Sequence, residues 1–186
     1  MLRPVLNRNL STITGEILML ALNIGDIKDF TNKLFLGEVF DRFFLTEATI
    51  TTFNTFSIDG RLRTDYFDTA EQELLTQSGR GFSYWKELRS LCCSIVRGKH
   101  TPLGFRIVFQ LPADQIAALV SVPDFPLCAE QIQGFYLNIQ FRNRTLLCTT
   151  GTSLKTFFPG RQADLLWDDW VLQFFRQNQI PFRLCD

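Results

Sequence analysis

Residues 43–60 read FFLTEATITTFNTFSIDG, and apolar and polar side chains alternate along this stretch. In an extended chain one face would carry Ala48, Ile50 and Thr52, and the other would carry Glu47, Thr49 and Thr51. This alternation, with dense β-branched residues, predicts a half-buried strand over 43–53. Asn54 allows a turn into a second strand over 55–58, and Asp59-Gly60 is a two-residue hairpin signal leading into a third over 61–67. The sequence therefore predicts a three-stranded meander.

Strand and helix patterns continue on both sides of this meander. Residues 20–24 alternate as a strand, and Asp26 is placed to cap a helix that follows it. A short helix is expected over 68–77. A longer one is expected after Ser83, with the apolar stripe Tyr84, Leu88, Leu91, Cys92 and Ile95. Gly98 ends this helix, so the first half of the chain predicts the order β-α-β-β-β-α.

The second half repeats this order. Strands are expected over 105–109, 137–141, 145–148 and 154–158, with turns at Asn143 and Thr150-Gly151, and helices are expected from Pro112 and after Gly160. We therefore predict an α+β fold of two β-α-β-β-β-α pseudo-repeats, residues 19–103 and 104–186, whose antiparallel sheets pack into one body about a pseudo-twofold axis. The alternative is one unrepeated α+β domain.

Residues 1–18 form a separate segment in this interpretation. Gly15-Glu16 must be encoded by a purine-rich run just upstream of Met19, where a bacterial ribosome-binding site would lie. One hypothesis is that translation begins at Met19, and the alternative is a frayed N-terminal extension.

Composition indicates a globular protein. The 186 residues are 46% hydrophobic and 20% charged, and nineteen Lys and Arg balance nineteen Asp and Glu. No signal peptide or membrane-spanning helix is expected, because apolar runs are far shorter than the roughly 18 residues that a span requires. The five cysteines are an odd number without regular spacing, which favours a reducing cytoplasm.

The residue inventory argues against most familiar catalytic chemistry. His100 is the single histidine, and there is no Cys-x-x-Cys pair for zinc. Cys92 falls on an apolar helix stripe and is interpreted as a core residue. Other candidate groups are interpreted as helix-terminus acids or as turns: Glu71 with Glu73, Asp164 with Asp168 and Asp169, Gly79-Arg80-Gly81 and Gly151–Thr156. No catalytic, cofactor-binding or metal-binding residue is predicted.

Clustered cations supply the candidate surface residues. The candidate basic surface comprises Arg61, Arg63, Arg97, Lys99, His100, Arg142 and Arg144. The competing explanation is the solvated outer face of an antiparallel sheet. The balanced net charge argues against a nucleic-acid partner.

Nineteen Phe residues, many of them doubled, are the most unusual feature of the composition. Along a strand, neighbouring side chains point to opposite faces, so one Phe of a pair such as Phe43-Phe44 would leave the main core. It would then lie under helices of the other half, or form an apolar patch for a protein partner or for self-association.

The stretch 40–60, with Tyr84-Trp85 and Gly98-Lys99-His100-Thr101-Pro102, resembles an uncharacterised bacterial family known only as a domain of unknown function. The resemblance runs from about Met19 onward and implies a bacterial, cytoplasmic protein without implying an activity. The tandem topology is also similar to that of sliding-clamp domains, although the helices lack the basic face of a clamp.

The sequence alone therefore predicts a non-catalytic cytoplasmic module for binding or protein interaction. One alternative is an enzyme that uses carboxylates and Arg on a small substrate. Another is a clamp-like accessory to nucleic acid.

Overall fold

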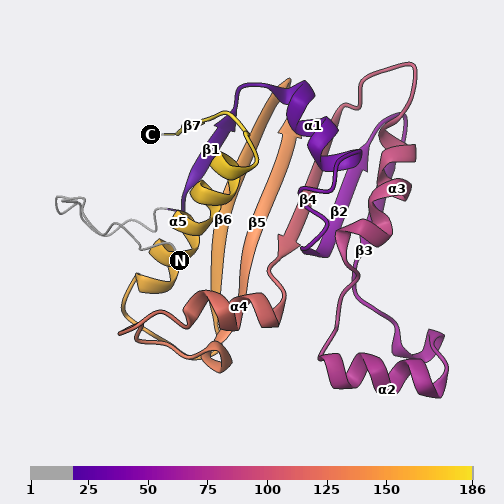
Figure 1. Ribbon diagram of the computed structural model, residues 1–186. Coiled ribbons are helices and arrows are strands. Elements are labelled where there is room, and N and C mark those ends of the chain that lie inside the picture. The colour runs from indigo at the N-terminus through magenta and orange to yellow at the C-terminus, as the bar shows by residue number, and fades with distance from the viewer. Residues whose placement is uncertain (1–18, 186) are drawn as a thin grey trace.

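The computed structural model describes residues 19–185, so the predicted N-terminal extension lies outside the described part (Figure 1). Seven strands form one antiparallel sheet in the order β3-β2-β4-β5-β6-β1-β7. Their bounds are β1 Ala21–Ile24, β2 Phe44–Thr51, β3 Thr55–Asp59, β4 Gly104–Gln110, β5 Ile132–Arg142, β6 Thr145–Leu154 and β7 Phe182–Leu184. The α+β class is confirmed.

Five α-helices and two short 3-10 helices connect the strands. They are α1 Ile27–Phe35, α2 Thr69–Ser78, α3 Trp85–Val96, α4 Ala113–Val120, α5 Gln162–Gln177, η1 Thr64–Tyr66 and η2 Ala129–Gln131. As expected, the Asp26 side chain accepts a hydrogen bond from the Asp29 backbone N–H at the start of α1. No described helix has both the length and the apolar character needed to cross a membrane.

Two hairpins were correctly predicted. β2 and β3 pair from Glu47 with Asp59 to Thr51 with Thr55, on either side of the turn that contains Asn54. β5 and β6 join through Asn143 and Arg144, whose φ angles of 51° and 60° suit a two-residue turn between twisted strands.

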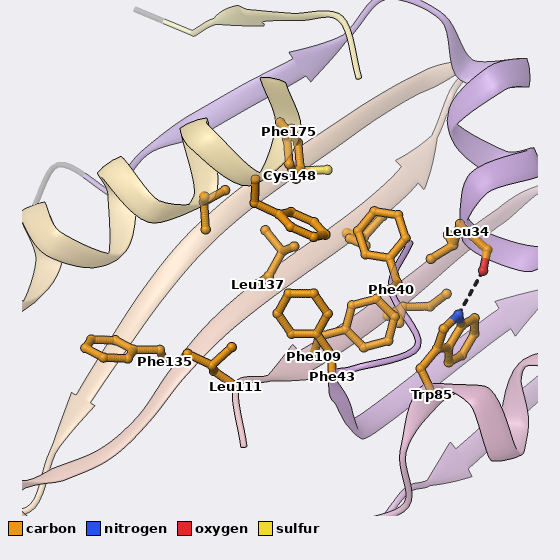
Figure 2. Packing of buried hydrophobic residues seen from close by; sticks show 14 of the residues in the cluster. Leu34, Phe40, Phe43, Trp85, Phe109, Leu111, Phe135, Leu137, Cys148 and Phe175 are labelled. Atoms are coloured by element: carbon orange, nitrogen blue, oxygen red, sulfur yellow. Dashed lines mark hydrogen bonds between the residues drawn. The ribbon is translucent and has the colours of Figure 1, made fainter. Parts of the chain in front are cut away.

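The helices other than α2 pack on one face of the sheet, and the hydrophobic core lies between the two layers. Eleven of the nineteen Phe side chains are buried, so most of them line this core, in agreement with the interpretation that places them beneath helices. Figure 2 shows Phe40, Phe43 and Phe109 meeting between helices and sheet. Phe43 and Phe44 are both buried, because the ring of Tyr84 covers Phe44 at a centroid distance of 4.7 Å.

The prediction of the fourth strand in each repeat is wrong. Residues 61–67 leave the sheet and include η1, and the predicted strand 154–158 is replaced by the end of β6 and a loop. Thr150-Gly151 is not a turn, because β5 is long enough to pair with β6 as far as Leu154. Gly60 serves close packing, since an added Cβ would lie 1.8 Å from the Leu45 carbonyl oxygen.

The two halves share the order strand, helix, strand, strand, and then helix, but their strands pair differently. β4 pairs directly with β5, whereas β4, β5 and β6 separate β1 from β2. In addition, a three-residue strand, β7, which is too short to show a pattern, pairs with β1 after α5. The internal duplication stays a prediction, and the single seven-stranded sheet has contributions from both halves.

Candidate interaction surfaces

Residues 61–82 form an arm that projects from the body and contains η1 and α2 (Figure 1). At its base Arg61 forms an isolated β-bridge with Phe82, and the Leu62 N–H donates to the Gly81 carbonyl. At its tip Asp68 and Glu71 form a reciprocal capping box at the start of α2. The sequence thus encodes a short, well-capped helix on a narrow two-stranded stem.

The tip of the arm, residues 64–79, is acidic and exposes apolar side chains, whereas its base carries Arg61, Arg63 and Arg80. No residue of α2 is buried, and the exposed fractions are 86% for Tyr66 and 64% for Leu74. Residues 64–79 contain four carboxylates and no Lys or Arg, the carboxylates being Asp65, Asp68, Glu71 and Glu73. Large exposed apolar side chains on a projecting element are a feature of interaction surfaces.

A second surface lies between α1 and α3 at their C-terminal ends. There, α1 and residues 93–102 enclose a depression of about 390 Å³, which we call the α1–α3 groove. Its apolar lining residues are Phe35, Leu36, Cys93, Val96 and Pro102, and its polar ones include Thr31, Asn32, Arg97, Lys99 and His100. The lining of the groove therefore combines apolar side chains with the basic residues Arg97, Lys99 and His100.

The predicted basic residues do not form one patch. Arg97, Lys99 and His100 line the α1–α3 groove. Arg142 lines a separate depression of about 320 Å³ on the neighbouring strand ends, together with Gly104 and Arg106. Arg144 follows in the β5–β6 turn.

The other two predicted cations are at the base of the arm. Arg61 is in the bridge described above, and the Arg63 guanidinium donates to the Asp59 carboxylate at 2.9 Å. Sequence reasoning did not select Arg106, which lines the second depression and pairs with Glu47 at 2.7 Å. Glu47 and Arg106 come together because their strands, β2 and β4, are neighbours in the sheet. That strand pairing could not be read from the sequence, so the ion pair was missed.

The Asp168 carboxylate takes part in hydrogen bonds that connect a helix to the sheet. The Thr150 hydroxyl donates to its carboxylate at 2.5 Å and accepts a hydrogen bond from the Leu20 N–H at 3.1 Å. Burial raises the pKa of Asp168, and the hydrogen bond from Thr150 partly opposes that rise. Asp164, in contrast, lies in the first turn of α5, as expected for a helix-terminus acid. Asp168 thus ties α5 to β6 and β1.

Cys92 is fully buried, and burial raises the pKa of its thiol to about 11. A thiol with this pKa is protonated at neutral pH and is a poor nucleophile. Among the residues that the structure describes, no group of three or more His, Cys, Asp or Glu side chains could hold a metal ion.

An aromatic ladder on α5 was not anticipated. Trp170 stacks between Trp167 and Phe174 with ring centroids 5.0 and 5.2 Å away, and the Arg42 guanidinium lies 5.0 Å above Trp170. Arg42 also donates to the Gln115 side chain at 3.1 Å, so it links α4 to α5. Partial burial lowers the pKa of Arg42. The Trp spacing was visible in the sequence, but the covering Arg42 comes from a loop more than a hundred residues away.

A protein-family comparison matches residues 33–183 with DUF5721, described as a family of unknown function. A comparison with curated proteins gave no match. A comparison with solved structures also gave none.

Proposed function

The chain belongs to DUF5721, a family of unknown function, and we propose that it is a non-catalytic interaction module whose arm binds another protein chain. The observation that carries the proposal is the arm itself, which exposes Tyr66 and Leu74 on an element held to the body only at its base. Large apolar side chains that stay exposed in a folded protein mark a surface that binds a partner.

The shape of the arm supports a recognition role. The capping box and the αL residue Gly79, with φ 61°, stabilise both ends of α2, so the helix is ordered before a partner arrives. A preformed element loses less conformational entropy on binding than a disordered one. An exposed Tyr such as Tyr66 is one of the residue types enriched among the side chains that dominate binding energy at interfaces.

The geometry favours binding over acid–base chemistry. The enzyme alternative called for carboxylates and Arg in one pocket, whereas the linings of both depressions contain Arg and no carboxylate. A clamp-like role would need a continuous basic track, but the cations are divided between the two ends of the molecule. We also place the module in the cytoplasm, on the ground that all five cysteines are free thiols.

Photocrosslinking in the native host tests the proposal. A photoreactive residue is placed at Leu74 on the arm, and a matched one at Leu165, which is also exposed but lies on α5. We expect specific adducts of higher mass from position 74 and at most a diffuse background from position 165.

The adduct is then identified by mass spectrometry and its partner purified. Calorimetry should show saturable binding to the wild-type chain and at least about tenfold weaker binding to the Y66A/L74A variant, because two anchors have been lost. Equal crosslinking from both positions, or unchanged affinity of that variant, would contradict an arm-based interaction.

A further inference from the structure

The α1–α3 groove has the chemistry of a receptor for an acidic, apolar segment. Leu36 in its lining is 56% exposed, and it lies beside Phe35, Val96 and Pro102. Arg97 and Lys99 follow the C-terminus of α3, where the helix dipole favours cations. The helix dipole accounts for the position of these two cations, but it does not account for the exposed apolar side chain of Leu36 in the same groove. The chain has no Asp or Glu between Glu87 and Asp114, so no carboxylate within that segment neutralises the charges of Arg97 and Lys99.

The arm is the complement of this groove. Its tip has four carboxylates and no cation over residues 64–79, and it exposes one aromatic and one aliphatic side chain. A groove lined by apolar and basic side chains is complementary in hydrophobicity and charge to a tip that exposes apolar side chains and carboxylates.

One molecule cannot place its own arm in its own groove. Tyr84, which follows the arm, bridges to Phe44 at the start of β2, whereas Gly104, which follows the groove loop, pairs with Thr51 at the end of β2. The eight residues of β2 span roughly 25 Å. Figure 1 shows α2 at one end of the molecule and the loop from α3 to β4 at the other. An arm that occupies this groove must therefore come from a separate chain.

We propose that the arm of one copy docks in the α1–α3 groove of a second copy. This inference rests on the proposed interaction function and names its partner. Each copy has one arm and one groove, so contacts run from head to tail or close reciprocally in a twofold dimer. The zero formal net charge means that no overall charge repulsion separates the copies.

Charge reversal at each surface tests the contact. The arm variant is D65K/E73K, which leaves the capping pair intact, and the groove variant is R97E/K99E. The matched controls reverse equally many exposed charges elsewhere, D114K/D169K and K155E/R183E. Circular dichroism and thermal melting establish that every variant is folded.

Sedimentation velocity and light scattering at low salt measure association. We expect the wild type to exceed the monomer mass as concentration rises, and added salt to weaken this association. The dissociation constant should rise at least about tenfold for the arm and groove variants and less than about twofold for the controls. The chain carrying all four reversals, D65K/E73K/R97E/K99E, should associate again, because both charges of the contact are inverted.

Mixing gives the decisive result. The groove variant keeps an intact arm, the arm variant keeps an intact groove, and their reversed surfaces are also complementary, so an equimolar mixture of the two should associate in a one-to-one ratio although neither associates alone. A mixture that stays monomeric overturns the proposal, as does a monomeric wild type or a control that weakens association as much as the arm variant.

These outcomes are separable from the proposed function. If the wild type is monomeric and position 74 crosslinks to a different protein, the second-copy inference fails and the interaction function stands. If position 74 also gives no specific adduct, both fail.

Discussion

Trp85 joins the two helices that form the groove, and replacing it should reveal how much that junction contributes to stability. Its side chain is fully buried, and its indole N–H donates to the Leu34 carbonyl at 2.8 Å (Figure 2). Leu34 is in the last turn of α1, where carbonyl groups have no partner within the helix. The indole therefore satisfies a buried acceptor that nothing else in the helix can reach.

The expected cost of W85F has two parts. A buried carbonyl left without a donor costs about 1–3 kcal/mol. The smaller ring leaves space beside Phe109, whose ring centroid is 5.1 Å away, and such loss of packing adds about 1–2 kcal/mol. Together we expect a loss of about 3 kcal/mol in the free energy of unfolding. With an m-value of about 2 kcal/mol/M, the urea midpoint should fall by about 1.5 M.

Urea unfolding followed by circular dichroism at 25 °C measures this loss. Two comparisons separate its parts. A benzothienylalanine at position 85 keeps the ring shape but lacks the N–H, so it should lose only the hydrogen-bond part. W170F, on a half-buried ring of the same type, should cost about 1 kcal/mol, since it mainly weakens stacking. If the benzothienyl variant unfolds within about 0.5 kcal/mol of the wild type, the importance assigned here to the Trp85–Leu34 bond is wrong.

Three further perturbations test other parts of the structure. G60A should destabilise the chain by about 2–3 kcal/mol, because its Cβ would meet the Leu45 backbone, whereas G98A, with the nearest atom 3.9 Å away, should be nearly neutral in the same urea titration. Because burial raises the pKa of Asp168 above its ordinary 3.8, the native state binds more protons than the unfolded state as pH rises from 3.8 through the native pKa. The wild type should lose stability across that window and D168N should not; parallel pH profiles of the unfolding free energy would refute this. In native-state hydrogen exchange, amides of α2 should exchange orders of magnitude faster than those of β5, since α2 buries no residue, and equal protection would mean that the arm packs on the body.

Local patterns accounted for most elements and for little of their arrangement. The β2–β3 hairpin, the cap of α1, the helix α2 and the core position of Cys92 followed from alternation, capping residues and helix periodicity. The same local rule failed at Gly60, where Asp59-Gly60 has the composition of a hairpin turn. A glycine after Asp is compatible with a turn but does not prove one. At Gly60 the glycine is needed for a different reason, because the backbone of Leu45 lies too close to leave room for a side chain.

The candidate surfaces show the same division. The sequence marked Arg97, Lys99 and His100, because cations following a helix are visible as a run. It also grouped them with Arg61 and Arg63, which lie at the other end of the molecule, since separation in space depends on strand order. The exposure of Tyr66, Leu74 and Leu36 was not visible at all, because whether an apolar side chain is covered depends on which element packs against it.

By itself, the sequence determined the secondary-structure class, a single histidine with no Cys-x-x-Cys pair and an apolar content sufficient for a large core. Only the tertiary structure decided that both halves share one sheet, that residues 61–82 leave it as an arm, and that the groove and the arm face different ends. Local propensities act over a few neighbouring residues, whereas strand order and exposure depend on contacts between residues far apart in the chain. Such contacts form only when the whole core closes.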